Sequence, residues 1–379
     1  MKRICLIISI FAVVLAGCKK NVVNSGNNGN DTNVIVTKVA NMLYEVTYDS
    51  YSSEPVGSYE ELAGDMACSS VRNGNYHGRN FDFFANSSST FVVRATATED
   101  RYATIGIARL AKVNDAMIDA GLTERQRQIL PWAILDGMNE KGLVVNNNVV
   151  SKKDWGVIPH DGTNKGAPDL NILFTTRAIL DNCATVQEAL DYLEEHNITP
   201  LGSDKMNLHI MLSDSEETCV VEVINNELVV IPDQYIMTNY HLFYDDIPDN
   251  AMGVERYDVL EEHYDEGGES MESMWELMKR VRYTNTYYAD NKWYSEIASI
   301  CGMTYSDIPG HETELYNTLT LIEAAWAAEK TKIEQQGCLS ADAKFWDTVH
   351  NTIYDMKNKK MWITVHENLL DKQIHTFDL

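Results

Sequence analysis

Basic side chains are scarce in this sequence. Its 379 residues include 31 Lys and Arg against 56 Asp and Glu, which gives a formal net charge of -25 at pH 7. Proteins that bind nucleic acids or anionic membrane surfaces do so through basic patches. The shortage of positive charge therefore argues against both as partners, and we interpret the acidic excess as a feature that favours solubility.

The sequence also lacks an apolar run long enough to cross a membrane, which takes about 20 residues. Its N-terminal run, residues 4–17, follows the basic Met1-Lys2-Arg3 and ends in Leu15-Ala16-Gly17-Cys18. A basic start and a short apolar core are typical of secretory signal peptides. The last four residues resemble the lipobox of bacterial lipoproteins, which implies that Cys18 is lipidated. The alternative is an ordinary signal peptide with a chance cysteine.

These features predict how the N-terminal region is organised. Residues 1–17 are expected to be a lipoprotein signal peptide. Residues 18–33, rich in Asn and Gly, are expected to be the lipidated Cys18 and a flexible tether. The protein is thus expected to be exported and anchored to a bacterial cell envelope, on its periplasmic or outer-membrane face. A homo-oligomer is compatible with the sequence, which does not determine oligomeric state.

Cysteine is sparse, and its spacing does not match a zinc motif. The seven cysteines include no Cys-x-x-Cys pair, and no His-rich stretch accompanies them. We therefore expect neither a metal nor a cofactor. Cys5 lies in the signal peptide. Four further cysteines could form disulfides in an exported chain, with the pairing left open: Cys183, Cys219, Cys301 and Cys338.

The hydrophobic fraction of 44% is enough for a globular core. Residues 34–67 are expected to form a helix that packs on the single domain formed by residues 68–379. The strands predicted in that domain are 68–82 (a hairpin), 91–97, 102–109, 142–150, 207–213, 218–224, 227–232, 235–239, 346–354, 360–366 and 372–378. The predicted helices are 124–134, 170–182, one that begins at 185, 253–264, 271–282 and 313–335. The order shows no regular β–α alternation, which favours an α+β fold of two antiparallel sheets covered by helices.

The hairpin at 68–82 places a cation beside a thiol. Asn73-Gly74 is a strong signal for a two-residue turn. This turn sets Arg79 directly opposite Cys68 on one face of the ladder. A neighbouring guanidinium lowers the pKa of a thiol and favours the nucleophilic thiolate. Asp82 has the opposite parity and would need a bulge to reach the same site.

This segment resembles a known family. Cys68-Ser69-Ser70 followed by Gly78-Arg79-Asn80-Phe81-Asp82 is similar to the start of the mature chain in the choloylglycine hydrolase family, which includes bile salt hydrolases and penicillin V acylases. Residues 136–143 (DGMNEKGL) resemble a further stretch that these enzymes share. The resemblance spans residues 68 to about 366. It implies the four-layer αββα fold of the N-terminal nucleophile hydrolases and activity on linear amides.

The resemblance also assigns site residues. Asp82 would orient the α-amino group, and two asparagines would donate to the oxyanion. The first is favoured at Asn148, with Asn146 and Asn147 left open. The distance of the late arginine from the second asparagine is shorter than in bile salt hydrolases. The positions assigned in this way are Cys68, Arg79, Asp82, Asn148, Asn239 and Arg256.

An N-terminal cysteine can supply both nucleophile and base. Its α-amine, with a pKa of about 8, can take the proton of a thiol with a pKa of about 8.5 and return it to the leaving amine. This chemistry requires cleavage between Ala67 and Cys68, so residues 34–67 are interpreted as a propeptide. The expected activity is hydrolysis of an N-acyl substrate of the conjugated bile salt, fatty-acyl amide or penicillin V type.

Two alternatives to hydrolysis stay open. An acyltransferase would pass the acyl group to an amine instead of water, and the sequence does not separate transfer from hydrolysis. A lipid-anchored binding protein would keep an unprocessed, inactive site, but the presence of Cys68, Asp82 and Asn239 argues against decay. His77 shares the face of Cys68 in the predicted register. No third group is available to orient a Cys–His pair, so we expect His77 to be a surface residue.

Overall fold

The computed structural model describes most of the chain from residue 34 onward. The described residues are 22–23, 34–58, 61, 67–84, 88–150, 161–200, 207–247, 251–282, 286–289, 292–294, 344–365 and 374–379. The predicted signal peptide, Cys18, most of the tether and the helix predicted at 313–335 lie outside these residues.

The larger sheet, which we call sheet A, has the strand order β1-β2-β3-β6-β7-β8-β9-β12-β13-β14. Its neighbours pair antiparallel, except that β3 and β6 run parallel. Its strands are β1 (Val22–Val23), β2 (Val34–Ala40), β3 (Leu43–Tyr48), β6 (Thr90–Ala95), β7 (Thr104–Arg109), β8 (Ile134–Asn139), β9 (Val144–Val150), β12 (Asn207–Ser213), β13 (Thr218–Ile224) and β14 (Glu227–Pro232).

The second sheet, sheet B, has the order β15-β4-β5-β18-β16-β17, and β19 and β20 extend it from β18. All of its pairs are antiparallel. Its strands are β4 (Ala67–Asn73), β5 (Tyr76–Phe84), β15 (Ile236–Met237), β16 (Thr286–Ala289), β17 (Lys292–Tyr294), β18 (Lys344–Asp355), β19 (Lys360–Val365) and β20 (His375–Asp378). A separate small sheet pairs β10 (Asp169–Asn171) with β11 (Asn197–Thr199).

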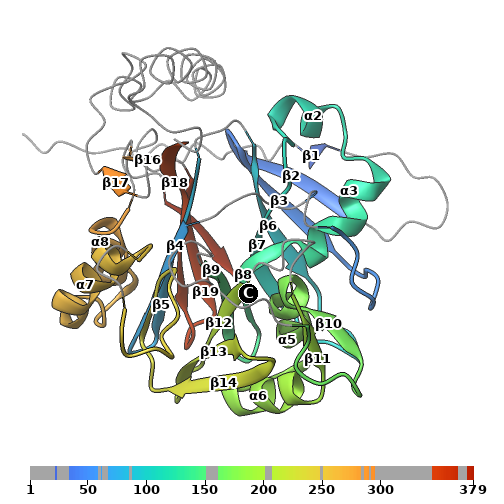
Figure 1. Ribbon diagram of the computed structural model, residues 1–379. Helices are drawn as coiled ribbons and strands as arrows, with labels where there is room; N and C mark the ends of the chain where they lie inside the picture. The colour runs from blue at the N-terminus through green and yellow to red at the C-terminus, as the bar shows by residue number, and fades with distance from the viewer. Residues whose placement is uncertain are drawn as a thin grey trace, which may run out of the picture.

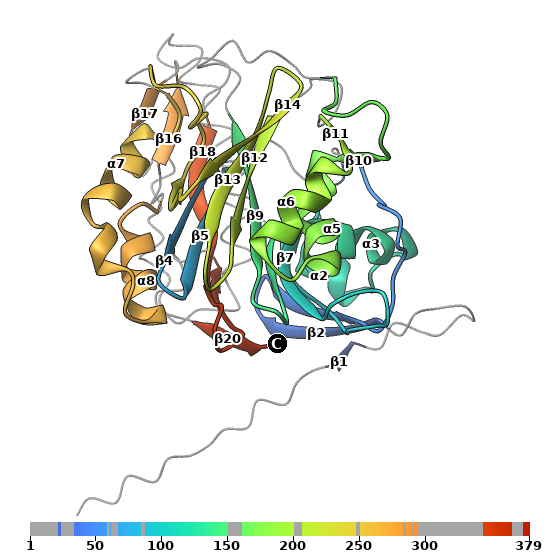
Figure 2. The same cartoon turned by 90° about the horizontal axis from the view of Figure 1, so that it is seen from below.

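Helices lie on the outer sides of the two large sheets, as Figures 1 and 2 show. Beside sheet A are α2 (Asp115–Asp119), α3 (Glu124–Ile129), α5 (Thr175–Asn182) and α6 (Val186–Glu194), with the short 3-10 turns Leu130–Trp132 and Ile172–Phe174. Beside sheet B are α7 (Val254–Glu262), the 3-10 turn Tyr264–Glu266, and α8 (Met271–Lys279).

Three hydrophobic clusters hold these layers together. The first joins sheet A to its helices, with Val145 of β9 and Ile179 of α5 among its members. The second lies between the sheets and contains Ile107 of β7 and Ile363 of β19. The third joins sheet B to its helices through residues such as Met274 of α8. Helix, sheet, sheet and helix are therefore stacked, and the predicted αββα fold is confirmed.

Most predicted elements are present. The strands predicted at 207–213, 218–224 and 227–232 coincide with β12, β13 and β14. In β12 and β13, alternate side chains belong to the cluster that joins sheet A to its helices, which is the two-residue periodicity of a strand, whereas the edge strand β14 is half-buried or exposed. Strand β8 was not predicted, because Gly137 and Asp136 both belong to residue types that are depleted in strands.

The helix predicted within residues 34–67 is wrong. Residues 34–48 instead form β2 and β3, which are part of sheet A. The run Val34-Ile35-Val36-Thr37 is β-branched and favours an extended chain. In β3 the residues Tyr44, Val46 and Tyr48 are buried at alternate positions, which is strand periodicity.

The predicted register of the first hairpin is also wrong, by two residues. The turn residues are Gly74 and Asn75, because Asn73 pairs with Tyr76. Gly74 takes a φ of +60°, and glycine is the residue favoured at the first central position of a type II′ turn. Cys68 therefore pairs with Phe81. A shift of two keeps every side chain on its predicted face.

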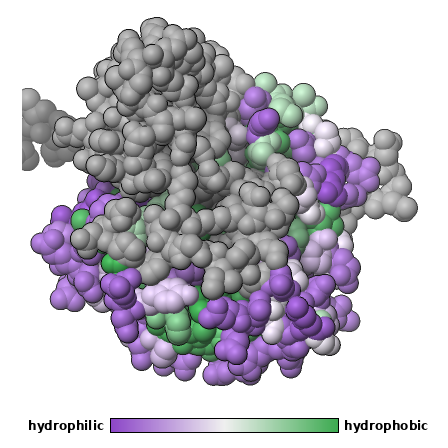
Figure 3. All heavy atoms as spheres, in the orientation of Figure 1, coloured by the Kyte–Doolittle hydropathy of each residue, from purple (hydrophilic) through white to green (hydrophobic). Residues whose placement is uncertain are grey.

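Hydrophilic residues predominate among the coloured atoms of the face drawn in Figure 3, in line with the excess of acidic side chains. Five large hydrophobic side chains are exposed among the described residues: Ile35, Met117, Val230, Phe243 and Tyr244. Within the described part of the chain, no helix has the length and apolarity that a membrane crossing requires.

Candidate active site

Cys68 lies near the start of β4, in the space between the two sheets. Its side chain is fully buried. Cys68, Ser70 and Arg79 point to the same side of the β4–β5 ladder, toward sheet A, because Cys68 pairs with Phe81 and Ser70 pairs with Arg79. The thiol therefore lies where β4 of sheet B approaches β9 of sheet A.

Arg79 contacts the thiol from a diagonal position. Its Nη2 lies 3.4 Å from Cys68 Sγ and donates to the backbone carbonyl of Asn147 at 2.9 Å. Its Nη1 forms a short ion pair with Asp136 Oδ1. The ion pair joins β5 of sheet B to β8 of sheet A. Both charged side chains are fully buried, so the pair lies in a low-dielectric interior.

Asp136 holds this arginine in place and was not predicted as a site residue. Its other oxygen, Oδ2, accepts hydrogen bonds from Thr352 Oγ1 at 2.8 Å and Tyr354 Oη at 2.6 Å. Burial alone would raise the pKa of Asp136, but the Arg79 charge and the surrounding donors keep it far below its usual range. The carboxylate is therefore the fixed negative partner of Arg79. Its place in the family stretch was visible in the sequence, although its contact was not.

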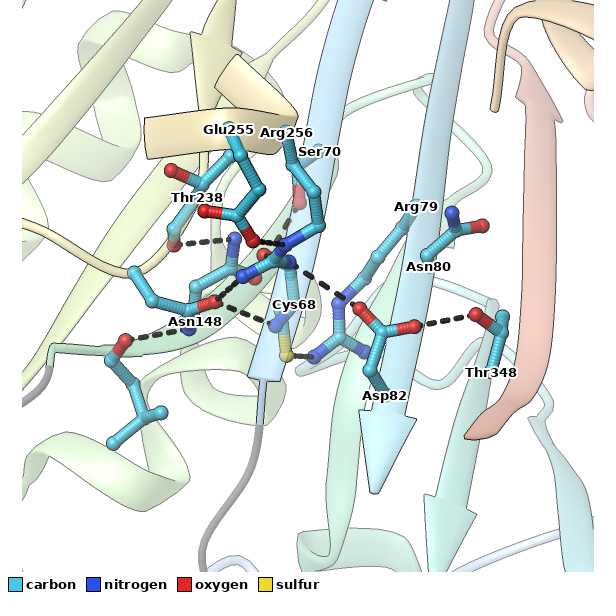
Figure 4. A network of polar contacts seen from close by, with 12 residues as sticks. Cys68, Ser70, Arg79, Asn80, Asp82, Asn148, Thr238, Glu255, Arg256 and Thr348 are labelled. Carbon is cyan, nitrogen blue, oxygen red and sulfur yellow. Dashed lines mark hydrogen bonds and ion pairs between the residues drawn. The ribbon is translucent and has the colours of Figure 1, made fainter. Parts of the chain in front are cut away.

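The backbone of Cys68 is bound on both sides. Its N–H donates to Asn239 Oδ1 at 2.8 Å, and Nη1 of Arg256 donates to its carbonyl oxygen in a short contact. Arg256 Nη2 donates to the same Asn239 Oδ1 at 2.6 Å, while Asn239 Nδ2 donates to Val149 O at 2.7 Å. Two donors around Oδ1 and one acceptor beside Nδ2 fix the orientation of the Asn239 amide. Figure 4 shows this network around Cys68.

Arg256 is therefore brought into the site, although α7 is distant from Cys68 in the sequence. It is buried, and its Nη1 also lies 3.3 Å from Asp82 Oδ2. Gly253, with a φ of +93°, precedes α7, and a Cβ at this position would lie 2.8 Å from Arg256 Nη2. The glycine thus leaves room for the guanidinium to reach the carbonyl of Cys68.

Asp82 lies on the other side of the ladder from the Cys68 side chain, as its parity requires. Its Oδ1 accepts from Thr348 Oγ1 at 2.6 Å, and Arg256 connects its Oδ2 to the Cys68 backbone. The β5–β18 ladder changes register between Thr348 and His350, directly beside this carboxylate. The register shift therefore lies in β18, the strand that pairs with β5. The sequence had instead suggested a bulge in the β4–β5 hairpin that contains Asp82.

The three consecutive asparagines of β9 divide by parity. Asn146 and Asn148 face sheet B: Asn146 Nδ2 donates to Ser70 Oγ at 2.8 Å, and Asn148 Oδ1 lies 3.4 Å from the same hydroxyl. Asn148 Nδ2 donates to the carbonyls of Met237 and Thr238, both at 3.2 Å. The Asn147 side chain points the other way, toward α5, where its Nδ2 lies 3.4 Å from Thr175 Oγ1. Only Asn146 and Asn148 thus face the layer that contains Cys68.

The thiol is not activated in this uncleaved chain. Burial raises the pKa of Cys68, and the lowering effects of Arg79 and Arg256 do not outweigh it. Arg79 thus lowers the pKa of the thiol, as predicted, but it does not set the direction of the net shift in the intact chain. The reason is that desolvation of the thiolate is the larger effect in a fully buried site.

A second buried network fixes the segment that contains Asn239. Glu222 of β13 accepts from the backbone N–H groups of Leu242 at 2.9 Å and Phe243 at 3.2 Å. Its carboxylate oxygens lie 3.1 Å from His209 Nδ1 and from His241 Nδ1. Burial alone would raise the pKa of Glu222, but the hydrogen bonds from the two histidines lower it to about 2. Residues 238–243 are therefore held against sheet A by a buried carboxylate.

The remaining candidate groups are His77 and the other cysteines, which lie outside this site or are uncharged. His77 is fully buried, so the prediction of a surface histidine is wrong; its Nε2 lies 2.9 Å from Asn146 Oδ1, and burial lowers its pKa to about 4. Cys183 and Cys219 are free thiols whose pKa burial raises to about 12. Cys301 and Cys338 lie outside the described residues. Among the described residues, no three His, Cys, Asp or Glu side chains are placed to share a metal ion.

The arrangement is suited to acyl transfer to sulfur. A thiol, a buried guanidinium beside it, and side-chain groups fixed on both backbone atoms of the same residue converge on Cys68. These are the parts needed to hold a nucleophile rigidly and to place positive charge near a developing anion. All six residues predicted for the site are found in or next to this network, and Asp136, Thr348 and Ser70 are additional members.

Comparison with known proteins finds a matching family and a related sequence. The family described as linear amide C-N hydrolases, choloylglycine hydrolase family, matches residues 66–267. Penicillin V acylase from Pectobacterium atrosepticum is 29% identical over 125 residues, a match that covers 31% of this chain and only 32% of that protein. The matched region thus spans about a third of the length of this relative.

Solved structures of two such enzymes also align with most of the chain. The Cys-to-Ala mutant of the conjugated bile acid hydrolase from Clostridium perfringens is 17% identical with a TM-score of 0.42, and the alignment covers 83% of this chain and 92% of that one. Penicillin V acylase from Agrobacterium tumefaciens is 18% identical with a TM-score of 0.40, covering 82% of this chain and 86% of that one.

Proposed function

This chain belongs to the choloylglycine hydrolase family of linear amide C-N hydrolases, and we propose that it is an N-terminal nucleophile amidase in which Cys68 attacks the carbonyl of an N-acyl substrate. One observation carries the proposal. The sulfur, the backbone nitrogen and the backbone oxygen of Cys68 each have a fixed polar partner, supplied by Arg79, Asn239 and Arg256. In a regular strand these backbone groups would bond to other backbone groups, and a buried structural thiol needs no guanidinium beside it.

The proposed reaction begins with cleavage of the bond between Ala67 and Cys68. Ala67 is small and buried at the start of β4, directly beside the thiol. Cleavage converts the Cys68 amide into a primary amine that can act as a base. It also opens the chain at the buried thiol, which lessens the desolvation that raises the thiol pKa.

The freed amine then serves both halves of the cycle. It takes the thiol proton as sulfur attacks the substrate carbonyl, and it returns this proton to the leaving amine as the C–N bond breaks. The acyl group is left as a thioester on Cys68. Water, deprotonated by the same amine, attacks the thioester, which releases the carboxylic acid and restores the thiol.

The neighbouring residues have distinct proposed roles. Asn239 Oδ1 lies at hydrogen-bond distance from the Cys68 nitrogen, which supports a role in orienting the amine. The amide nitrogens of Asn239 and Asn148 are the proposed oxyanion donors, and each would exchange its present bond to a backbone carbonyl for the substrate oxygen. Asp82 and Arg256 would keep the Cys68 backbone in register.

The proposed substrates are small N-acyl amides of the conjugated bile salt, fatty-acyl amide or penicillin V type. The names of the relatives support two of these types, since one is called a penicillin V acylase and another a conjugated bile acid hydrolase. We further propose that lipidation at Cys18 anchors the protein to the cell envelope, for which the Leu15-Ala16-Gly17-Cys18 sequence is the support.

The test is the mass of the purified protein, wild type and Cys68→Ala, followed by a screen of N-acyl amides for released amine. We expect a wild-type fragment that begins at Cys68, an uncut variant, and amine release by the wild type alone. A wild type that keeps Ala67 joined to Cys68 would contradict the proposal and favour a binding protein with an unprocessed site. Release of the anchor by Cys18→Ala tests the localisation separately.

A further inference from the structure

The segment that precedes the proposed cleavage point is built into the core of the fold. β3 pairs with β6 along its whole length, from Leu43 opposite Thr90 to Tyr48 opposite Ala95. On its other edge β3 pairs with β2. Without these two strands, sheet A would end at β6 and expose an unpaired edge, which proteins usually avoid.

Most side chains of β3 are buried, and these lie on both faces of sheet A. Tyr44, Val46 and Tyr48 face the helices and belong to the cluster that joins them to the sheet, while Leu43 faces sheet B. Each of these four side chains is at most 1% exposed. Removing the segment would open both interlayer cores at once.

Polar contacts fix both ends of β3 to the rest of the fold. Before the strand, the N–H of Met42 lies 3.1 Å from both carboxylate oxygens of Asp115, and the carbonyl of Met42 accepts from Thr90 N at 2.8 Å. At its end, the hydroxyl of Tyr48 donates to the carbonyl of Arg127 at 2.9 Å. These partners come from α2, β6 and α3, all of which follow the cleavage point in the sequence.

We propose that residues 34–67 are not a discarded propeptide but remain bound after cleavage as a separate chain that completes sheet A. This inference rests on the proposed cleavage between Ala67 and Cys68. That bond lies at the start of β4 in sheet B, whereas β2 and β3 belong to sheet A, so cutting it breaks no strand pair of sheet A. The mature protein is then two chains held together without a covalent bond.

This arrangement gives the N-terminal segment a second use. If Cys18 carries a lipid, the anchor and Cys68 end up on different chains after cleavage. The catalytic chain then stays at the membrane only through non-covalent contacts with the N-terminal fragment, chiefly the pairing of β3 with β6 and the burial of β3 side chains. The interaction surface is thus the β6 edge of the catalytic chain, and its partner is the N-terminal fragment of the same polypeptide.

The test compares two full-length proteins in detergent, each captured by a tag after Leu379. One is the wild type. The other is Cys68→Ala with a protease recognition site inserted between Glu54 and Pro55, two exposed residues, so that its cleavage does not depend on Cys68. After cutting, both are washed under native conditions and then in urea, and the eluted fragments are identified by mass.

We expect the fragment that contains β2 and β3 to stay bound through the native wash and to leave only in urea. Loss of this fragment in the native wash from either protein would overturn the inference, even if the wild type is active. A wild type that is never cut would contradict the proposed function, while retention in the inserted variant would still support the inference. The two failures are therefore distinguishable.

A matched pair of substitutions locates the contact. In the inserted variant, Val46→Ala removes a fully buried side chain of β3, whereas Ile35→Ala changes a side chain of β2 that is 51% exposed. We expect Val46→Ala to lower the urea concentration at which the fragment leaves, and Ile35→Ala to leave it nearly unchanged. Equal effects of the two would contradict burial of β3 as the source of the binding.

Discussion

Nη2 of Arg79 lies 3.4 Å from Sγ of Cys68, although the two residues are not opposite each other in the β4–β5 ladder. Arg79 reaches the sulfur diagonally, from the position opposite Ser70, and long side chains can bridge such a diagonal. The same guanidinium binds Asn147 O and Asp136, so its position is set by sheet A as well as by its own hairpin. The contact is therefore a property of the packed sheets.

Replacing Arg79 by lysine tests the role of this geometry. Lysine keeps the charge but cannot bind the sulfur, the Asn147 carbonyl and Asp136 together, because it lacks the planar fork of donors. We expect kcat/KM to fall about 10- to 100-fold, the loss typical of a hydrogen bond to a charged group. The pKa of the thiol, read from the pH dependence of its alkylation by iodoacetamide, should rise, because Arg79 lowers it.

Arg125→Lys is the matched control, because Arg125 forms an exposed ion pair with Glu61. It should leave both activity and thiol titration unchanged. Full activity of Arg79→Lys would show that charge alone is sufficient and that the observed geometry is unimportant.

The sequence predicted the elements of this site better than their connections. Faces were predictable, because alternation of buried and exposed residues is set locally and survives a register error of two residues. The pairing of β3 with β6 was not, because a parallel pair between distant segments leaves no local signal. Likewise, Asp136 belonged to a visible family stretch, but its contact with Arg79 depends on how the two sheets pack.

Replacing Asp136 by asparagine should destabilise the fold. The substitution keeps the shape but leaves Arg79 as a buried charge without its carboxylate, a loss that typically costs about 3–5 kcal/mol. In the wild type, folding lowers the pKa of Asp136. The Asp136 carboxylate therefore stabilises the fold at neutral pH, and this stabilisation is lost only as pH falls through the pKa of the folded protein. Urea unfolding at pH 7 measures the difference.

Glu61→Gln serves as the control for Asp136→Asn, because Glu61 pairs with Arg125 at the surface. We expect a change of about 0–1 kcal/mol in its free energy of unfolding. If Asp136→Asn unfolds at the same urea concentration as Glu61→Gln, the buried pair contributes nothing beyond a surface pair, and the proposed anchoring of Arg79 is contradicted.

Glu222 should act on the site through Asn239. Glu222→Gln replaces an acceptor of two backbone N–H groups and should loosen residues 238–243, which lowers kcat more than it changes KM. Stability should change in a pH-dependent way. The folded pKa of about 2 lies below the unfolded value of about 4.3, so the stabilisation is complete above pH 5 and is lost as pH falls toward 2.

Urea unfolding of wild type and Glu222→Gln between pH 3 and 7 tests this expectation. The difference in unfolding free energy should be largest near pH 7, on the order of 3 kcal/mol, and should shrink on acidification. Glu227→Gln, at the start of the edge strand β14 and exposed, is the control. A difference that grows on acidification would have the wrong sign for a carboxylate with a lowered pKa and would exclude this role.

The three asparagines of β9 can be separated by substitution, since parity sends their side chains to opposite sides of sheet A. Asn148→Ala removes the proposed oxyanion donor and should lower kcat by about 10²–10³, the usual cost of one such donor. Asn147→Ala removes a side chain that faces α5, so it should lower the urea midpoint while leaving kcat nearly unchanged. Because Asn146 bonds both Ser70 and His77, Asn146→Ala should affect stability and activity together.

Kinetics and urea unfolding measured on the same three variants rank their effects on kcat and on stability. A kcat loss in Asn147→Ala as large as that in Asn148→Ala would contradict the assignment of Asn148, because the Asn147 side chain points away from the thiol.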